Sequence, residues 1–395
     1  MFELSNIRIE ENDDSVLLKS DFNSDYFGKD TIWFSLNKAS DCKFQADRYD
    51  CFLVALLYPA MILNEDIIIN GKVSEKLIFN INNYVKHFIR LYSQINNDIE
   101  INCTETTNEG YKESVHIGTG FSGGVDSLCT IYDHLEIETN KNYKIDTLMF
   151  FNTGSHGVYS SKITESKFYD RYNYLKEFSP LPFYALNSNI HKFHEFIVDS
   201  HQKTVTFTNV AGILSLQNYF SKYYVASSLS YEETLDYGKK RLNICTESFE
   251  PILLPLLSTE SITIIPDGQQ YNRVEKTIKI LNYELARKSL NVCVSHKVSN
   301  SKNCSSCTKC LRTLYTLESI DKLDNFASLF DLKTYKKNIF LFKCKQRVLY
   351  KRNPFAKENI DLARKNRKYV PSFILSVIIC IPKIIQKLME KIFKK

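Results

Sequence analysis

The chain has 395 residues, 44% hydrophobic and 24% charged, an ordinary composition for a globular protein with about two to three domains. The excess of basic over acidic residues is only 6 and lies largely near the C-terminal end, so the charge indicates no nucleic-acid surface. No basic segment or apolar run opens the sequence, so no secretory signal is expected, and the 11 cysteines favour a reducing compartment, the cytoplasm.

Residues 1–110 are predicted to form a small α/β module of their own. Thr31–Leu36 and Asp66–Gly71 have the composition of strands. Between them, Tyr49–Met61 is apolar over a length that fits a buried helix. The polar stretch Thr104–Glu113 is interpreted as the linker to the next domain.

A glycine-rich stretch follows this linker. Val115–Thr119 alternates as a strand does, and it precedes Gly120–Ser127, which reads Gly-Phe-Ser-Gly-Gly-Val-Asp-Ser. From Leu128 onward the apolar residues recur at helical spacing. The sequence therefore predicts a strand, a tight turn and a helix, in that order.

The residue types in this turn suit a bound phosphate. Gly123 and Gly124 lack a Cβ, so the backbone can approach a ligand closely, and the N–H groups at the start of the helix favour an anion. Ser122 and Ser127 add hydroxyl donors. Asp126 would repel phosphate by itself, but its carboxylate suits Mg²⁺, which binds carboxylate and phosphate oxygens. We therefore expect a site for a magnesium-bound pyrophosphate group.

The segment Ser122–Ser127 resembles the PP-loop of the ATP pyrophosphatase superfamily, also described as adenine nucleotide alpha-hydrolase-like. It is not a Walker P-loop, because no Gly-Lys-Ser/Thr follows the glycines. Members of the superfamily cleave ATP between the α- and β-phosphates and adenylate a carboxylate, an amide or a similar oxygen. The resemblance implies a parallel-sheet, HUP-like domain of the Rossmann type. The nucleotide-binding residues that it implies here are Phe121, Ser122, Gly123, Gly124, Val125, Asp126 and Ser127, and the catalytic ones are Ser122, Asp126 and Ser127.

Strands and helices alternate after the PP-loop, which is typical of a parallel α/β sheet. Ligands of such sheets bind beyond the carboxyl ends of the strands, so the loops there should lie near the nucleotide. The resemblance implies that Phe151 and Asn152 contact adenine, and it makes Ser227 and Ser228 candidates. His156 is left open as a site residue or a turn residue. The predicted strands are Ile145–Phe151, Pro182–Leu186, Tyr223–Ser228 and Ile262–Ile265.

Two further groups of polar residues are expected either to bind a ligand or simply to lie on the surface. His191, His194 and His201 include a pair at helical spacing that could bind a metal, but surface histidines are favoured because no other ligand stands at a fixed spacing. Arg273 and Lys276 lie one helical turn apart after a predicted strand. They either clamp phosphate or the acyl substrate, or they form a solvated basic face.

Four cysteines near residue 300 have the spacing of a metal site. Two residues separate Cys304 from Cys307 and Cys307 from Cys310, and ten separate Cys293 from Cys304. Such a set matches a closed tetrahedral zinc site, and an iron–sulfur cluster is the less favoured alternative. Arg312 is expected either to neutralise thiolate charge or to reach phosphate.

A PP-loop followed by this cysteine pattern resembles the 7-cyano-7-deazaguanine synthase family over about Val115–Leu317. Those enzymes turn a carboxylate into a nitrile with ATP and ammonia, and they carry zinc at the cysteines. The resemblance therefore implies ATP, Mg²⁺ and Zn²⁺. The chain departs from the family in its long N-terminal segment, its looser spacing to the first cysteine and its C-terminal extension.

The C-terminal residues are predicted to form a basic helical extension. The apolar run Val370–Ile381 is too short to cross a bilayer as a helix. From Ile384 onward, an apolar face and a lysine-rich face suit an anionic membrane surface, a partner or the chain's own core. The predicted domains are thus 1–110, 111–320 and 321–395.

The predicted function is that of an ATP-dependent C–N ligase. It adenylates a small-molecule or protein carboxylate with release of pyrophosphate, and ammonia or an amine attacks the acyl-adenylate. The catalytic set adds Arg273 and Lys276 to Ser122, Asp126 and Ser127. A PP-loop sulfur transferase acting on tRNA is disfavoured by the absence of a basic stripe, and a nucleotide-binding regulatory or defence module by the intact PP-loop. The expected location is cytoplasmic, with peripheral membrane contact through the tail and a homodimer left open.

Overall fold

The structure is a computed structural model that describes residues 1–154, 162–240, 245–293 and 303–381. The chain divides into two compact units. The predicted boundaries at residues 110 and 320 fall inside the first and the second unit, respectively. The first unit comprises Met1–Phe121, Asp133–Ser228 and Thr234–Asp267, and the second comprises Ser122–Tyr132, Leu229–Glu233 and Gly268–Lys395.

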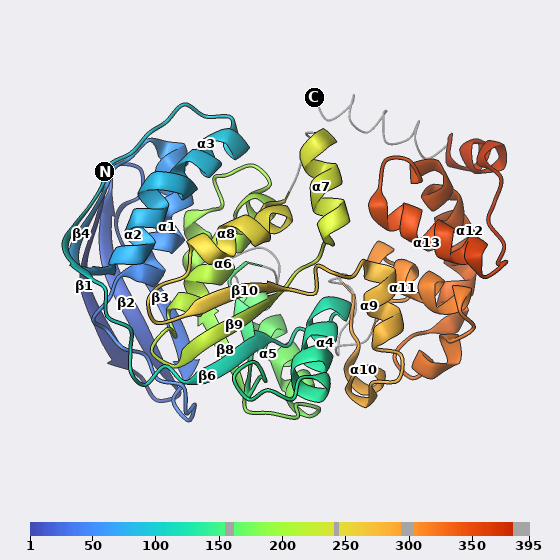
Figure 1. The fold of residues 1–395 in the computed structure, drawn as a ribbon, viewed down its shortest axis with the longest axis horizontal. Coiled ribbons are helices and arrows are strands. Elements are labelled where there is room, and N and C mark those ends of the chain that lie inside the picture. Colours follow the sequence, from blue (N-terminus) through green and yellow to red (C-terminus); the bar gives the residue numbers. More distant parts are fainter. Residues whose placement is uncertain (155–161, 241–244, 294–302, 382–395) are drawn as a thin grey trace. The chain divides into compact units, whose positions relative to one another are not determined.

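The first unit is built on one 10-stranded sheet with the order β10-β9-β6-β7-β8-β3-β2-β1-β4-β5 (Figure 1). Most neighbouring strands in it are parallel. The strands are β1 (Phe2–Glu11), β2 (Ser15–Ser24), β3 (Gly28–Asn37), β4 (Ile67–Ser74), β5 (Ile101–Thr107), β6 (His116–Gly120), β7 (Thr147–Asn152), β8 (Phe183–Ser188), β9 (Phe220–Ala226) and β10 (Thr263–Asp267).

Strands β6 to β10 form the parallel half of the sheet, as the alternation of strands and helices predicts. The chain runs from β6 outward through β7 to β8, and it then returns to the other side of β6 for β9 and β10. This is the order of a doubly wound, Rossmann-like sheet, and it places a topological switch point at the carboxyl ends of β6 and β9. The predicted α/β class with a mostly parallel sheet is therefore confirmed.

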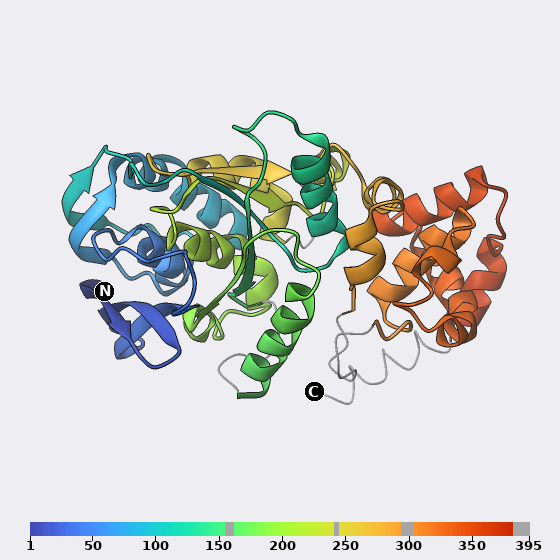
Figure 2. The same cartoon turned by 90° about the horizontal axis from the view of Figure 1, so that it is seen from below.

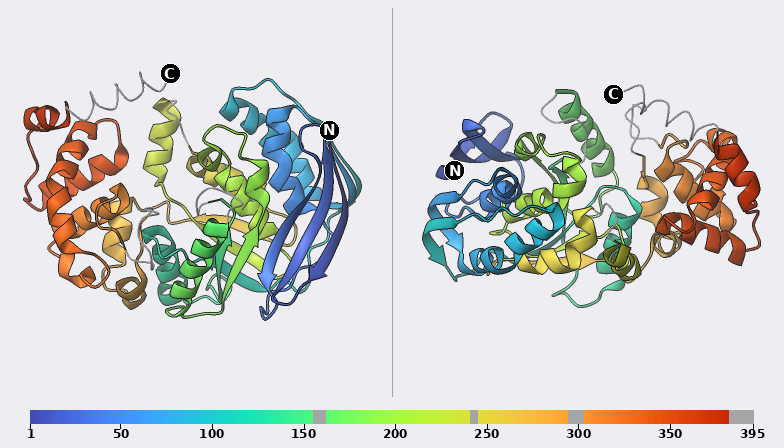
Figure 3. Two further views of the ribbon diagram at one scale, coloured as in Figure 1. Left: turned by 180° about the vertical axis from the view of Figure 1, so that it is seen from behind. Right: turned by 90° about the horizontal axis from the view of Figure 1, so that it is seen from above.

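The N-terminal strands continue the same sheet (dark blue in Figure 3). β1, β2 and β3 pair antiparallel, and β3 pairs antiparallel with β8, where Ser35 lies opposite Asn187. β4 joins β1 and β5 joins β4, both in parallel. Residues 1–110 thus share a hydrogen-bonded ladder with the parallel half. The predicted linker Thr104–Glu113 is shorter than expected, because β5 extends to Thr107.

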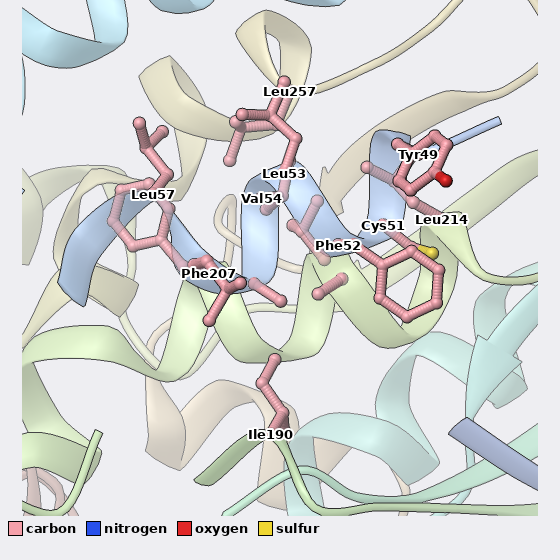
Figure 4. Close-up of a cluster of buried hydrophobic side chains, with 14 of the residues drawn as sticks. Tyr49, Cys51, Phe52, Leu53, Val54, Leu57, Ile190, Phe207, Leu214 and Leu257 are labelled. Carbon is pink, nitrogen blue, oxygen red and sulfur yellow. The ribbon is translucent and has the colours of Figure 1, made fainter. Parts of the chain in front are cut away.

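Helix α1 (Asp50–Leu63) lies at the centre of the hydrophobic core (Figure 4). Every residue from Asp50 to Met61 is buried, which explains why the segment shows no polar face. Phe207 and Leu214 of α6 (Ser200–Leu214) pack against it. Helix α8 (Glu250–Leu256) belongs to this layer.

The apolar segment Pro251–Leu257 contains two prolines. The segment belongs to helix α8, and Pro251 occupies its first turn, where a backbone N–H has no intrahelical partner to lose. A second proline, Pro255, lies inside the helix near its end.

Helix α5 (Lys162–Lys176) covers the opposite face of the parallel half (Figure 2). The rings of Phe168 on α5 and Phe150 on β7 stack with centroids 5.1 Å apart. Because neighbouring side chains of a strand point to opposite faces, Met149 joins the α1–α6 core instead.

The other helices outside the second unit are α2 (Glu75–Asn80), the π-helix Ile81–Val85, α3 (Lys86–Ser93), the 3-10 helices Ile190–Phe193 and Thr246–Phe249, and α7 (Tyr231–Lys240), whose first residues belong to the second unit.

The second unit is helical in its described residues. Its central helix, α11, packs against α9, α12 and α13, and α13 also packs against α9. Ala356 and Ile360 on α13 and Leu314 on α11 are fully buried in this bundle. The predicted basic extension thus contains two helices that pack on the preceding part of the chain. The helices are α4 (Val125–Ile131), α9 (Arg273–Lys279), α10 (Glu284–Ser289), α11 (Thr308–Ser319), α12 (Leu332–Leu349) and α13 (Pro354–Lys365), with a 3-10 turn at Leu323–Phe326.

Among the described residues, no helix combines the length and the apolarity that a membrane span requires. The predicted apolar run is helical from residue 373 to residue 381, and Phe373, Ile374 and Ile378 on it are exposed. The predicted amphipathic tail from Ile384 lies outside the described residues.

Candidate nucleotide site and metal centre

The end of β6 is fixed from both sides of the sheet. Thr119 donates its hydroxyl to the carbonyl oxygen of Tyr224 on β9 at 2.8 Å. The N–H of Phe121 donates to the carbonyl oxygen of Met149 on β7 at 2.8 Å. Thr119 and Phe121 are both fully buried. The chain therefore leaves β6 in a defined direction, at the switch-point end of the strand.

The glycine-rich turn has the predicted form. Gly123 has a φ of 71°, a left-handed conformation that residues with a Cβ rarely adopt, and Gly124 begins α4 from an extended conformation. The hydroxyl oxygens of Ser122 and Ser127 lie 3.1 Å apart. The N–H of Gly124 donates to the Ser122 oxygen at 3.3 Å. Ser122 is exposed and Ser127 is buried, so a ligand can reach the first hydroxyl directly.

Asp126 on α4 and two cations on α9 form a compact charged cluster. Arg273 Nη1 lies 2.7 Å from Asp126 Oδ2, and Lys276 Nζ lies 3.4 Å from Asp126 Oδ1. The side chains of Asp126, Arg273 and Lys276 are only 17%, 13% and 1% exposed. The alternative of a solvated basic face is therefore wrong for Lys276. Burial by itself raises the pKa of Asp126, but the neighbouring cations outweigh it and hold that pKa below its usual value.

The sequence around α9 fixes these two cations. Asn272 and Glu275 form a capping box at the start of the helix, which sets its first turn. Gly268 has a φ of +77°, and a Cβ there would lie 3.3 Å from Lys276 Cε. Gly268 therefore leaves room for the buried lysine side chain.

Asp126 does not form a complete magnesium site with other side chains. Both its oxygens are engaged by cations. Among the described residues, the one group of three or more His, Cys, Asp or Glu side chains with metal-binding geometry is a cysteine cluster. A single carboxylate holds Mg²⁺ when substrate phosphates supply other oxygen ligands. Asp126 can therefore bind Mg²⁺ only together with substrate phosphates, and only after Arg273 or Lys276 no longer pairs with it.

Three residues from distant parts of the second unit surround this cluster. The guanidinium of Arg312 on α11 lies 4.0 Å from the ring centroid of Phe355 on α13, and that of Arg273 lies 5.9 Å from the same ring. Burial, and then the charge of Arg273, lower the pKa of Arg312 to about 10. Glu358, also on α13, accepts a hydrogen bond from the N–H of Val274 at 3.2 Å. Sequence analysis missed Phe355 and Glu358, because no motif or spacing connects α13 to the PP-loop.

The four predicted metal ligands come together. The Sγ atoms of Cys293, Cys304, Cys307 and Cys310 all lie within 4.8 Å of one another. The N–H groups of Cys304, Cys307 and Cys310 donate to the sulfurs of Cys293, Cys304 and Cys307 at 3.4, 3.2 and 3.5 Å. Such hydrogen bonds stabilise thiolates, and a set of four thiolates fits a metal such as zinc.

Asn303 joins the two chain segments that carry these cysteines, a contact that the sequence analysis missed. Its Oδ1 accepts from the N–H of Val292 at 2.9 Å, and its Nδ2 donates to the carbonyl oxygen of Leu290 at 2.9 Å. Asn303 is 6% exposed. Its buried hydrogen bonds to the segment before Cys293 therefore hold Cys293 next to Cys304.

The predicted adenine-contact residues lie at the carboxyl end of β7, in the first unit. Asn152 is buried, and its Nδ2 donates to Asn187 Oδ1 on β8 at 2.6 Å. Phe151 stacks on Tyr223 of β9 with centroids 5.8 Å apart. Their contact with adenine stays a prediction. His156 lies outside the described residues.

The two serines after β9 are engaged by acidic side chains. Ser227 donates its hydroxyl to Glu250 at 2.8 Å, and Ser228 donates to Glu247 at 2.9 Å. Ser227 is fully buried, so its hydroxyl serves the fold at this strand end.

His191 and His194 are core residues, so the expectation of surface histidines is wrong for this pair. They are 4% and 1% exposed. His194 Nε2 lies 2.9 Å from the carbonyl oxygen of Ala55 on α1. Burial lowers the pKa of His191 to about 3 and that of His194 to about 4, so both rings are neutral at pH 7. They are part of no metal group among the described residues.

A histidine–aspartate pair at the end of β10 was not anticipated from the sequence. His134 Nε2 lies 2.9 Å from Asp267 Oδ1, and its Nδ1 lies 3.3 Å from the carbonyl oxygen of Tyr143. The ring stacks on Tyr224 with centroids 3.7 Å apart. Both ring nitrogens face acceptors, so the protonated ring satisfies both contacts.

A scan against protein-family models found no matching family, and searches of the curated proteins and of the solved structures found no significant match to this chain.

Proposed function

We propose that this protein is an ATP-dependent ligase that adenylates a carboxylate and releases pyrophosphate. The observation that supports the proposal most directly is the pairing of Asp126, at the start of the helix after the glycine-rich turn, with the buried cations Arg273 and Lys276. A buried cation pair next to a turn of glycines and hydroxyl groups suits the phosphates of a nucleotide.

The ion pairs of Asp126 give the site a simple way to receive ATP. A triphosphate carries more negative charge than one carboxylate, so Arg273 and Lys276 move from Asp126 to the phosphate oxygens. That exchange frees Asp126 for the Mg²⁺ that accompanies ATP. The protein thereby keeps its cations paired before and after the nucleotide binds.

The chemistry that follows is a displacement at the α-phosphorus. A carboxylate oxygen of the acceptor forms a bond to the α-phosphorus, the bond to the oxygen that bridges the α- and β-phosphates breaks, and pyrophosphate leaves with that electron pair. Arg273 and Lys276 stabilise the charge that develops on the leaving group, and Ser122 donates a hydrogen bond to it. Ammonia or an amine then attacks the acyl carbon, and AMP leaves.

The deciding experiment follows the products of ATP labelled in the γ-phosphate, with Mg²⁺, ammonia and a panel of carboxylates. Label in pyrophosphate, dependent on one carboxylate, supports the proposal. Label only in orthophosphate, or no turnover by protein that binds ATP, contradicts it. Asp126→Asn should abolish pyrophosphate release, whereas Asp13→Asn, which changes an exposed residue between β1 and β2, should not.

A further inference from the structure

A second group of buried polar atoms lies beside the charged cluster and is not used by it. It comprises Arg312 on α11, Glu358 on α13, Glu233 after the end of β9, and Gln269 after β10. Among the described residues, Nε of Arg312, Oε1 of Glu233, Oε1 of Glu358 and both amide atoms of Gln269 are buried without a hydrogen-bond partner. An unsatisfied buried polar group costs about 1–3 kcal/mol, so several in one place indicate a ligand site.

Arg312 is a cation without a carboxylate of its own. Its guanidinium stacks on Phe355, and no described carboxylate lies within ion-pair distance of it. The charges of Asp126, Glu358 and Glu233 all act on it. A planar guanidinium with free N–H groups suits a carboxylate ligand, which it can bind through two parallel hydrogen bonds.

Glu233 and Glu358 lie close together, and few other hydrogen-bond donors reach them. Glu233 is 5% exposed and accepts from the N–H of Ser230 at 2.7 Å through one oxygen. Glu358 accepts from the N–H of Val274 through one oxygen. Burial, the charge of Glu233 and a hydrogen bond between the two side chains raise the pKa of Glu358 to about 8, so the pair holds a proton at pH 7. A ligand ammonium beside the pair would replace that proton and bind both carboxylates.

Gln269 supplies independent support for a ligand. It is 1% exposed, and its backbone carbonyl oxygen accepts from the N–H of Tyr231 at 2.8 Å, which ties it to the turn that carries Glu233. Its preceding residue, Gly268, packs against Lys276. The backbone of Gln269 thus connects the segment beside Lys276 with the turn that carries Glu233, and its buried amide can both donate and accept.

A phosphate fits this second group poorly, because the negative charge of the acidic pair would repel it. A carboxylate ligand without an amine would offer no cation to the acidic pair. A ligand with a carboxylate and a nearby ammonium satisfies both the guanidinium and the acidic pair.

We propose that Arg312, Glu233, Glu358 and Gln269 form the acceptor subsite, and that the acceptor is an amino acid or a similar small carboxylate with a neighbouring amine. The carboxylate binds Arg312 and the ammonium binds the two glutamates. As an acceptor site, the assignment rests on the proposed ligase function. As a binding site for an amino acid, it can be tested without ATP.

The test is calorimetric titration of the full chain with the standard amino acids, each beside an analogue that lacks the amine, such as glutamate beside glutarate and phenylalanine beside 3-phenylpropionate. At least one amino acid should bind with a Kd below about 1 mM, and its amine-free analogue about tenfold more weakly or worse. Equal binding of the analogue, or no binding by any amino acid, overturns the proposal.

Variants locate the binding. Arg312→Gln and Glu358→Gln should each weaken amino-acid binding about tenfold or more, and by a larger factor than they weaken ATP binding. Arg312→Lys keeps a charge and should bind better than Arg312→Gln, which separates a binding defect from a folding defect. The matched controls Arg352→Gln and Glu232→Gln change exposed side chains and should have no effect. Binding that none of the subsite variants weakens places the ligand elsewhere and overturns the proposal.

The two proposals fail in different ways. Amino-acid binding that depends on Arg312, without pyrophosphate release from ATP, contradicts the ligase and leaves the subsite standing. Pyrophosphate release that amine-free carboxylates drive as well as amino acids supports the ligase and overturns the subsite.

Discussion

The side chain of Lys276 is 1% exposed, and an ammonium buried to that degree is stable only beside a negative group. Asp126 is that group in the structure, and the phosphates take its place in the proposed complex. Because Arg273 also pairs with Asp126 at 2.7 Å, the carboxylate keeps one partner when Lys276 is removed. Lys276 can therefore be replaced with less damage to the fold than Asp126.

Lys276→Met should lower kcat/KM for pyrophosphate release about 10²- to 10³-fold, because one charge that stabilises the leaving group is lost. Stopped assays with the labelled ATP measure this. Lys288→Met is the matched control, since Lys288 is an exposed lysine, with a side chain 56% exposed. Equal activity of both variants would remove Lys276 from the catalytic set.

His134 predicts a pH-dependent contribution to stability. Burial by itself lowers the pKa of His134, but the contacts with Asp267 outweigh it and raise that pKa above the ordinary 6.5. The protonated ring is thus favoured in the folded state. The resulting stabilisation is fully present below the unfolded pKa of 6.5 and is lost as the pH rises through the folded pKa.

His134→Gln should therefore cost more free energy of unfolding at about pH 5 than at about pH 9. Urea denaturation of both proteins at the two pH values measures the difference. His87→Gln, which changes an exposed histidine outside this contact, is the control variant. A cost of His134→Gln that is constant across this range would show that the ring contributes by packing on Tyr224 alone.

At the scale of elements, the short-range patterns were predicted well. The strand, turn and helix around Gly123 follow from residues adjacent in the chain, and so does the approach of Cys304, Cys307 and Cys310. Phe355 and Glu358 could not be found this way. They reach Arg312 and Val274 through the packing of α13 on α11 and α9, which no local periodicity encodes.

Helix α11 begins at the cysteine cluster. Cys307 is its N-cap residue, and Arg312 follows within the second turn of the helix. A metal held by the four sulfurs would therefore fix the start of the helix that carries Arg312. It would support the candidate site through the fold, without taking part in the chemistry itself.

Cys307→Ser should reduce bound zinc to well below one per chain and lower the stability of the second unit, because binding of a structural metal contributes to the free energy of folding. Elemental analysis and thermal unfolding of purified protein measure the two effects. Cys103→Ser changes a cysteine of β5 outside the cluster and should alter neither. Full metal content in Cys307→Ser, or iron in place of zinc, would contradict the zinc assignment.

At the scale of the molecule, the sequence could not reveal that residues 1–110 share a sheet with β6 to β10. The link is the pairing of β3 with β8, whose residues lie about 150 positions apart in the chain, as with Ser35 and Asn187. Strand pairing over such a separation leaves no local signature, since the alternation of a strand is the same whichever strand it pairs with. A polar linker after β5 therefore resembled a domain boundary.

The continuous ladder predicts that the N-terminal strands and the parallel half unfold together. Asn189 reinforces the junction, because its Oδ1 accepts from the N–H of Trp33 at 2.8 Å and its Nδ2 donates to the carbonyl oxygen of Thr31 at 2.8 Å. Trp33 is the single tryptophan of the chain, so its fluorescence reports on β3. Hydrogen exchange measured on peptides of β6 and β7 reports on the other half.

Asn189→Ala should lower the free energy of unfolding by about 1–3 kcal/mol in both signals, because it leaves two backbone groups of β3 without their partner. Asn108→Ala, at an exposed position after β5, should change neither. The two midpoints in urea should coincide in the wild type and shift together in the variant, as one cooperative unit requires. If the fluorescence midpoint moved alone, β3 and β8 would be in contact without stabilising each other, and the N-terminal residues would be a separate folding unit after all.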